Sequence, residues 1–243
     1  MILLDTLIVL DISYQFGGVS DAIHPVLLVD DKSMVLVDCG FSGFLPAVEQ
    51  AALGHGLDLQ NLTHVIITHH DHDHMGALHA LKSKYPKVRV LSSREEEPYI
   101  CGREKSLRLA QAEKRQAELP DDHKAFGEAF IKLLRGVQPQ AVDDTVQDGD
   151  VLPFCGGVHV IATPGHTPGH ISLYLPIQKV LIAGDAAVLE NERAAIANPA
   201  FTLDMEAAQR SLEKLLESDA ETIVFYHGGS IAPSKLLYNN TKE

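Results

Sequence analysis

The chain has 243 residues, and 33 acidic against 20 basic side chains give it a formal net charge of −13. This length predicts one large domain or two small ones, and a hydrophobic fraction of 45% is enough for a packed core. A strongly acidic balance disfavours binding to nucleic acid, which requires a basic surface. We therefore expect no nucleic-acid partner.

The cysteines and the N-terminus indicate the cellular setting. Cys39, Cys101 and Cys155 are widely spaced, which favours reduced thiols over a disulfide framework. The apolar N-terminus carries Asp5 and Asp11 and lacks a basic start, so it is typical of a first strand rather than of a signal peptide. No apolar run approaches the ~18 residues that a membrane span requires. We expect a soluble, cytoplasmic protein without membrane contact.

Short apolar runs alternate with helical stretches in the first part of the chain. Strands are predicted at 6–12, 24–30, 33–40, 63–68 and 87–93, and helices at 44–53 and 75–85. Glycines and aspartates at 17–18 and 30–31 predict turns between the first strands, and 14–23 is expected to form a loop.

Residues 94–136 interrupt this alternation with a charged, helix-prone segment. Six apolar side chains share one stripe of its last predicted helix: Ala125, Phe126, Ala129, Phe130, Leu133 and Leu134. We expect a helical insertion at about 94–136 that leans on the main body through this stripe and lies near the functional site. An ordinary solvent-facing pair of helices is the alternative.

Strand signals return in the last part of the chain, at 158–163, 170–175, 179–185 and 222–229, and a helix fits 204–217. No linker or low-complexity segment interrupts the sequence, which predicts a single domain over 1–243. Strands flanked by helices in both halves favour an α/β fold with two sheets between helical layers.

The stretch HHDHDH (69–74), directly after the strand 63–68, holds four histidines and two aspartates. His69, Asp71 and Asp73 alternate, so all three can point to one side of an extended backbone. His74 then lies at the start of the next helix, where Gly76 permits close backbone approach.

Residues between these alternating positions form a competing register. His70 and His72 should point away from the other three side chains, so we expect them to lie behind the ligands or at the surface. The remaining histidines are expected to be exposed or structural: His24, His55, His64, His79, His123 and His159.

Four other strand ends carry residues of ligand type. His166 lies in the stiff turn TPGHTPGH, Asp185 in IAGDA, His227 in FYHGG and Asp38 in LVDCG. A carboxylate at the end of a buried strand, such as that of Asp185, is costly unless it is paired with a cation or a metal.

Together the motifs THHDHDHMG, TPGHTPGH, AGDA and YHGG, in this order, resemble the metallo-β-lactamase superfamily of metal-dependent hydrolases. With Asp38, the resemblance spans residues 38 to 229. It implies an αββα four-layer sandwich of two mixed β-sheets flanked by helices. The usual first motif of the family is His-x-His-x-Asp-His. Because Asp71 replaces its second histidine, this chain resembles the His-x-Asp-x-Asp-His branch.

The resemblance also implies a binuclear metal centre. Its ligands would be His69, Asp71 and His166 at a first position; Asp73, His74 and His227 at a second; and Asp185 as a bridge. Asp38 and His170 are expected to orient these ligands and not to bind metal. The expected cofactors are two divalent ions, with Zn(II) favoured and Mn(II) or Fe(II) as alternatives because Asp71 adds an oxygen ligand.

Such a centre generates a bridging hydroxide that attacks a carbonyl or phosphoryl group. Asp73 is the expected catalytic residue, because it would orient the hydroxide and shuttle a proton. Asp71 changes the charge of the site. Three carboxylates and one hydroxide balance two divalent ions, whereas a histidine at position 71 would leave one positive charge.

The predicted function is hydrolysis of a small ester, thioester or lactone. Phe16, Tyr99 and Ile100 are expected to supply apolar contact from the loop 14–23 and the insertion. Three alternatives stay open: a phosphodiesterase or nuclease, a di-iron redox or oxygen-binding module of the same fold, and a non-catalytic metal-binding scaffold. The expected partner is a small-molecule substrate, and a homodimer is a further option.

Overall fold

The computed structural model describes residues 6–16 and 18–237. Its first sheet has six strands, in the spatial order β1 (Thr6–Val9), β4 (Val26–Val29), β5 (Met34–Val37), β6 (His64–Ile67), β7 (Arg89–Ser93) and β8 (Asp144–Val146). The pairs from β1 to β5 are antiparallel, and those from β5 to β8 are parallel. The parallel strands β5 and β6 therefore end at the same edge, where ligand residues follow them.

The second sheet also has six strands, in the order β16 (Gly229–Ile231), β15 (Thr222–Phe225), β12 (Val180–Ile182), β11 (Ile171–Leu175), β10 (Val158–Ala162) and β9 (Val151–Leu152). Only the β12–β15 pair is parallel. Two hairpins stand outside the sheets: β2 (Ile12–Phe16) with β3 (Val19–Ile23), and β13 (Val188–Glu190) with β14 (Arg193–Ala195).

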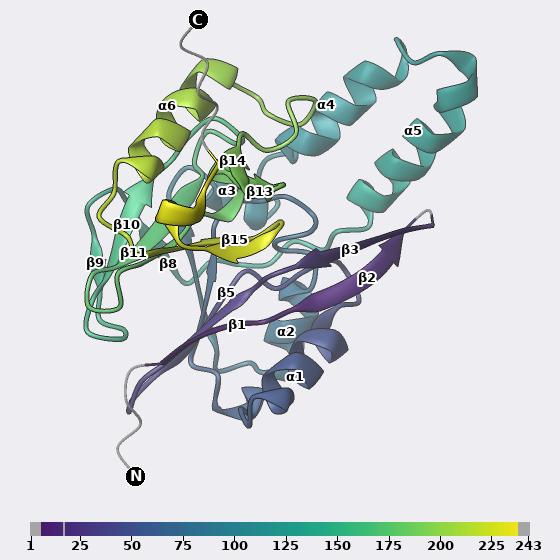
Figure 1. The fold of residues 1–243 in the computed structure, drawn as a ribbon. Coiled ribbons are helices and arrows are strands. Elements are labelled where there is room, and N and C mark those ends of the chain that lie inside the picture. Colours follow the sequence, from purple (N-terminus) through teal and green to yellow (C-terminus); the bar gives the residue numbers. More distant parts are fainter. Residues whose placement is uncertain (1–5, 17, 238–243) are drawn as a thin grey trace, which may run out of the picture.

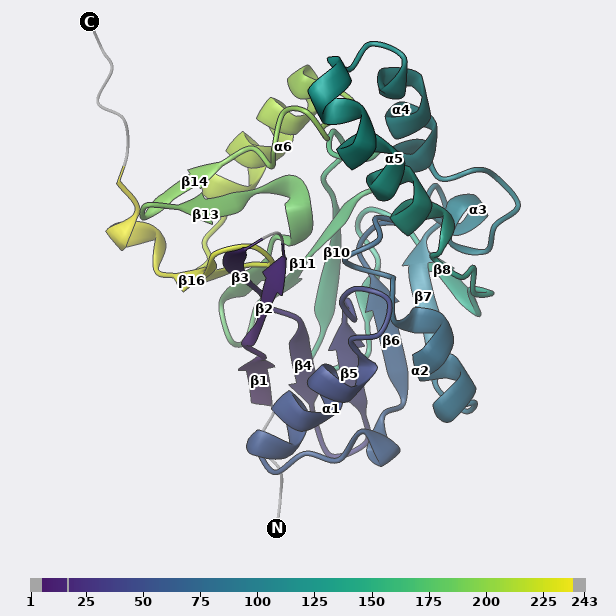
Figure 2. The same ribbon diagram turned by 90° about the vertical axis from the view of Figure 1, so that its right-hand side faces the viewer.

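Helices cover the outer faces of both sheets, as Figures 1 and 2 show. Helices α1 (Leu45–Gly54) and α2 (Leu78–Lys84) share a core with the first sheet, and α6 (Met205–Leu216) shares one with the second. A third core fills the space between the sheets. Strands β4 and β5 are buried along their whole length because both of their faces are covered. The expected αββα sandwich is confirmed.

Three further helices form the segment 94–136: α3 (Glu97–Ile100), α4 (Leu107–Gln116) and α5 (Asp121–Arg135). Helices α4 and α5 run side by side and project from the sandwich (Figures 1 and 2). Short 3₁₀ turns lie at η1 (Leu59–Asn61), η2 (Gly184–Ala186) and η3 (Pro233–Lys235).

The apolar stripe predicted for α5 is wrong at most of its positions, because only Leu134 of its six residues is buried. The buried residues of this helix are Gly127, Ile131 and Leu134, whereas Phe126 is 64% exposed and Leu133 36% exposed. The reason is that α5 packs on α4 rather than flat on the body. A Cβ at Gly127 would lie only 2.0 Å from the side chain of Gln116, so the missing side chain permits this contact.

Several element boundaries also differ from the prediction. The expected loop 14–23 is mostly strand, in the β2–β3 hairpin, and the short strands β8, β9, β13 and β14 were missed. Helix α2 begins at Leu78 rather than at residue 75, because the backbone first turns through the histidine-rich stretch. Among the described residues, we find no helix with the length and apolar character needed to cross a membrane.

Candidate metal centre

All seven residues predicted as ligands follow strands of the two sheets, at the edge where the ends of these strands meet. The stretch 69–74 follows β6 of the first sheet. From the second sheet come His166, in the turn between β10 and β11, Asp185, in η2 after β12, and His227, after β15. Residues almost 160 positions apart in sequence therefore meet because two sheets, each with its own strand order, face one another at this edge.

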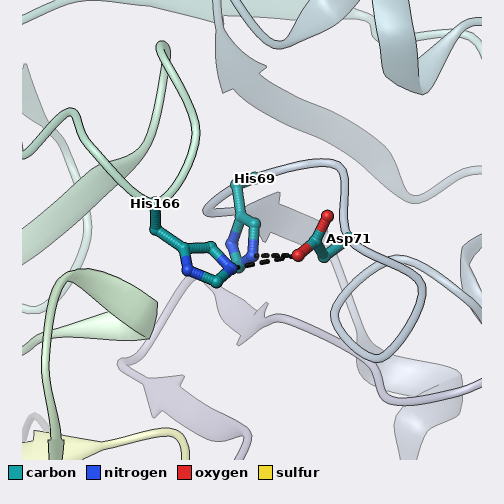
Figure 3. A group of neighbouring side chains, drawn as sticks. All are labelled: His69, Asp71 and His166. Atoms are coloured by element: carbon teal, nitrogen blue, oxygen red, sulfur yellow. Dashed lines mark hydrogen bonds and ion pairs between the residues drawn. The ribbon is translucent and has the colours of Figure 1, made fainter. Parts of the chain in front are cut away.

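The ligand atoms of these residues fall into three overlapping groups, each with its atoms within 4.8 Å of one another. The groups are His69, Asp71 and His166; His69, His74 and Asp185; and Asp73, His74 and His227. Figure 3 shows the first group, in which both imidazoles face one carboxylate oxygen of Asp71. His166 Nε2 lies 3.0 Å from Asp71 Oδ2, and His69 Nε2 lies 3.7 Å from the same atom.

Asp185, a member of the second group, lies between the first group and the third. Its Oδ1 atom is 3.2 Å from His74 Nε2 and 3.6 Å from His227 Nε2, while Oδ2 is 3.5 Å from His166 Nε2. The two oxygens of one carboxylate therefore face histidines of different groups. This is the geometry that a bridging ligand requires.

The buried atoms of this cluster fit a metal. Five of them have no hydrogen-bond partner among the described residues: His69 Nε2, Asp71 Oδ1, His74 Nε2, His166 Nδ1 and Asp185 Oδ1. A buried polar atom without a partner costs roughly 1–3 kcal/mol, so the native state requires something else to satisfy these atoms. Imidazole nitrogens and carboxylate oxygens are suitable ligands for divalent transition metals.

Electrostatics keep the carboxylates of the cluster ionised. Burial alone would raise the pKa of Asp185, but His74, His227 and His166 outweigh burial and hold that pKa well below its ordinary value. The pKa of Asp73 is lowered in the same way, by His72, His74 and His227 against the effect of burial. Ionised carboxylates are the form that binds metal.

Asp38 contacts one of the histidines of the cluster. Its Oδ2 atom accepts a hydrogen bond of 2.8 Å from His74 Nδ1, which directs His74 Nε2 toward Asp185. Thr68 fixes the carboxylate by donating its backbone N–H to Oδ1 at 2.9 Å and its hydroxyl to Oδ2 at 2.8 Å. A carboxylate behind a ligating histidine fixes both its tautomer and its orientation.

His170 supports Asp185 through the backbone. Its Nε2 atom accepts the backbone N–H of Asp185 at 2.9 Å, and its Nδ1 atom lies 2.8 Å from the Thr163 hydroxyl. Burial and the neighbouring His69 lower the pKa of His170 well below its usual value, so the ring is neutral and can accept. Gly184 permits this approach, because a Cβ there would lie 2.6 Å from His170 Nε2.

The two intervening histidines lie outside the three groups. His70 is buried, and its backbone N–H donates to Glu96 Oε2 at 2.9 Å, while its ring also pairs with Glu96. The other Glu96 oxygen accepts from the Thr167 hydroxyl at 2.7 Å and the Gly169 N–H at 2.9 Å. Glu96, which sequence reasoning missed, therefore ties the stretch 69–74 to the loop that carries His166.

His72 faces the cavity instead of the ligand atoms. Its ring packs edge-on against Phe41 and Phe130, with ring centroids 5.4 and 5.5 Å away. Its Nδ1 atom lies 3.4 Å from Asp73 Oδ1.

A cavity of about 400 Å³ opens onto the cluster, within the usual range for small-molecule sites. Its lining combines polar residues of the cluster with apolar side chains from Phe130, Val188, Leu189, Ala197 and Phe201. The loop 14–23 contributes Asp21 to the wall.

The apolar contacts predicted for Tyr99 and Ile100 are wrong. Ile100 is fully buried in the core of the first sheet, and Tyr99 stacks on His70 outside this cavity. The side chain of Phe16 lies outside the described part of the structure. The segment 94–136 does line the cavity, but through Phe130 and Arg108.

Arg108 is the main residue that sequence reasoning missed. It begins α4 next to Leu107, and its guanidinium donates to Asp71 Oδ2 from Nε at 3.0 Å and from Nη2 at 2.7 Å. Several arginines occur in the segment 94–136, and no sequence pattern distinguishes this one. The only available signal was Asp71 itself, since a buried carboxylate calls for a cation.

A two-sheet sandwich with a histidine and aspartate cluster at its strand ends defines a class of metal-dependent hydrolases. The family described as the metallo-beta-lactamase superfamily matches residues 21–227, and the chain belongs to it.

Similar proteins agree with this assignment. A probable metallo-hydrolase, YflN, from Bacillus subtilis (strain 168) is 32% identical over 213 residues, covering 82% of this chain and 76% of that protein. A metallo-beta-lactamase family protein from Thermus thermophilus matches with a TM-score of 0.73 and 26% identity, over 94% of this chain and 75% of the other. A hydroxyacylglutathione hydrolase from Mesorhizobium japonicum is 29% identical, over 66% of this chain but only 46% of that protein. The chain is a metal-dependent hydrolase.

Proposed function

We propose that this protein is a binuclear metallohydrolase that cleaves a small ester, thioester or lactone. The observation that carries the proposal is the position of Asp185, whose two oxygens face histidines of both ligand groups. In this assignment His69, Asp71 and His166 bind the first metal, and Asp73, His74 and His227 bind the second. Two bound divalent ions would supply an acidified water and Lewis acidity toward a carbonyl group.

Asp73 is the proposed catalytic residue. It lines the cavity, and its Oδ2 atom lies 3.2 Å from His227 Nε2. The Tyr226 hydroxyl donates to its backbone carbonyl at 2.6 Å, which fixes the backbone behind the carboxylate. An ionised carboxylate held at the cavity wall can accept a proton from the attacking water and deliver it to the leaving group.

The cavity favours a substrate with an apolar part. Its lining includes aromatic and aliphatic side chains as well as carboxylates, and the chain as a whole is acidic. These features disfavour a polyanionic substrate such as nucleic acid. Relatives named hydroxyacylglutathione hydrolases support a thioester, since an acyl group on glutathione is a thioester, although this chain covers less than half of several of them.

The test is metal analysis combined with a substrate panel. Purified protein should contain Zn(II), with Mn(II) or Fe(II) as alternatives, and should hydrolyse at least one of a chromogenic ester, a thioester and a lactone. Chelation should abolish this activity, and added metal should restore it. Efficient hydrolysis of a bis-phosphodiester by metal-loaded protein, with no hydrolysis of the three carbonyl substrates, would overturn the proposed substrate class.

A further inference from the structure

Arg108 is buried at the first metal position. Arg108 is 2% exposed, and each of the three nitrogens of its guanidinium donates a hydrogen bond. Nε and Nη2 donate to Asp71 Oδ2, and Nη1 donates to Gln111 Oε1 at 2.5 Å and to the Phe201 carbonyl. Its guanidinium also lies over the ring of Phe201, 5.0 Å from the centroid. These contacts leave little capacity for recognising a substrate anion.

Two successive residues of α4, Leu107 and Arg108, join the segment 94–136 to the stretch 69–74. Leu107 donates its backbone N–H to His70 Nε2 at 3.2 Å, and Arg108 follows it onto Asp71. The first turn of α4, capped by Ser106, is therefore fixed on the stretch 69–74. Arg108 Nη2 also lies 3.2 Å from His166 Nε2, a second ligand atom of the same position.

Stability alone does not account for this buried ion pair. Burying a charge pair costs several kcal/mol of desolvation per ion, and an apolar replacement of equal volume is often as stable. The charge of the ligand set offers a specific reason. Asp71 places a negative charge where the family motif has a neutral histidine, and the guanidinium adds one positive charge to the same oxygen.

We propose that Arg108 is a positioning residue that offsets the charge of Asp71 and makes the first metal position the weaker of the two. This inference rests on the binuclear centre proposed above. The negative charge of Asp71 and the positive charge of Arg108 cancel. The side chains at the first position therefore carry the same net charge as they would with a neutral histidine at position 71 and no arginine. The second position, formed by Asp73, His74 and His227, has no arginine among the ion-pair partners of its carboxylate in the described structure.

Repulsion explains the difference in affinity. Arg108 donates to Asp71 Oδ2 and lies 3.2 Å from His166 Nε2, so a metal held by Asp71 and His166 would lie close to the guanidinium. Like charges a few ångströms apart repel by several kcal/mol at an effective dielectric constant of ~20. Metal binding at this position must therefore compete with the guanidinium, whereas binding at the second position does not.

The experiment compares wild-type protein with Arg108→Met and Arg115→Met. Arg115 is the matched control, because it lies on the same helix and donates to the Ala200 carbonyl at 2.6 Å but is exposed. Zn(II) is titrated into metal-free protein by calorimetry with a competing chelator. The binding event that His166→Ala abolishes identifies the first position. Thermal unfolding of the metal-free proteins is measured in parallel.

Arg108→Met should tighten the first position at least ~10-fold and leave the second unchanged, since only the first loses a neighbouring cation. It should also lower the unfolding temperature of the metal-free protein by roughly 6–20 °C, because Asp71 loses its partner. Arg115→Met should change neither. A merely structural role for Arg108 would weaken both positions or leave both unaltered.

A second variant keeps the test decisive if Arg108→Met folds poorly. Asp71→His combined with Arg108→Met removes both charges and should recover at least half of the lost unfolding temperature. Failure of this recovery, or equal shifts at both positions, would overturn the inference while leaving two metal sites in place. Wild-type protein that binds no metal would instead overturn the proposed centre itself, and the inference with it.

Discussion

The two halves of the ligand cluster differ in their access to solvent. The first group, His69, Asp71 and His166, is fully buried, and helix α4 covers it. In the second group, the His227 side chain is 25% exposed and that of Asp73 is 14% exposed. Both groups use similar ligand types, so the covering segment 94–136 accounts for the difference.

This contrast assigns different work to the two halves. Asp71 and His166 also line the cavity, but they are only 4% exposed and are held by fixed hydrogen bonds. Asp73 and His227 are more exposed and can more readily meet a substrate. We expect the first position to act mainly in binding and charge balance, and the second to contribute the acid–base residue. Substitutions in the two halves should therefore separate metal content from turnover.

Asp185→Asn should have the largest effect, because the carboxylate of Asp185 contacts histidines from both halves. Removing its charge should weaken both metal positions at least ~100-fold, beyond the 10–100-fold typical of residues behind a ligand. Activity should fall to background. The measurement is metal stoichiometry after dialysis, together with hydrolysis of the best substrate. Loss of metal from only one position would show that Asp185 does not bridge.

Asp73→Asn should reduce turnover more than it reduces metal content. Loss of a positioned acid–base group typically lowers the rate by ~10²–10⁴-fold, while KM should change little. The measurement is steady-state kinetics at saturating metal. Full turnover by this variant with both metals bound would contradict the proposed role.

His72→Ala is the matched control for Asp73→Asn. His72 adjoins Asp73 in sequence and lines the same cavity, but it lies outside the three ligand groups. Its loss should leave metal content nearly intact. A marked loss of metal would place the imidazole of His72 among the ligands and overturn the assigned register.

Asp38→Asn should produce an intermediate effect confined to the second half. Asp38 accepts from His74 Nδ1, so loss of its charge should weaken the second position by ~10–100-fold and spare the first. Titration of metal-free protein with Zn(II) measures the affinity of each of the two metal positions. Thr68→Val is the control, because it removes the hydroxyl donor to Asp38 and leaves the Asp38–His74 contact. Equal weakening of both positions by Asp38→Asn would indicate general unfolding of the site.

The sequence predicted much of this arrangement for a physical reason. Strand ends carry ligand residues in short, strongly patterned motifs. The alternation of residues 69, 71 and 73 does not explain their direction, because the backbone turns at 72–74 instead of staying extended. Asp38 and His170 were predicted as supports because each lies beside a motif, and their contacts with His74 and Asp185 are compatible with that role. The roles of the metal ligands remain predictions, although the geometry brings all seven together.

Residues that contact the cluster but lie far from its motifs in the sequence could not be predicted in this way. Arg108 and Glu96 reach the cluster from the segment 94–136, whose packing depends on the tertiary contact of α4 with α5. The same dependence explains the wrong stripe on α5. Its buried face is determined by a glycine contact with a neighbouring helix, and periodicity along one helix does not contain that information.

A third region, far from both halves, provides the smallest predicted effect and a reference for the others. Glu49 on α1 accepts from the Tyr85 hydroxyl at 2.6 Å and from Lys84 Nζ at 2.8 Å, at the end of α2. Burial would raise the pKa of Glu49, but these two partners outweigh burial and lower it. A folded-state pKa below the unfolded value contributes stability above pH ~4.3 that is lost as the pH falls through the folded value.

Glu49→Gln should therefore destabilise the protein by about 0.5–1 kcal/mol at pH 7. The difference from wild type should shrink below pH ~4, where the wild-type carboxylate is also protonated. Denaturant unfolding of metal-free protein at pH 7 and at pH 3.5 measures this. Both metal affinities at pH 7 should match wild type, because α1 contributes no residue to the three ligand groups. A change in either metal affinity would show that helix α1 is coupled to the ligand cluster. The segment 94–136 would then not be the sole source of the difference between the two halves of the cluster.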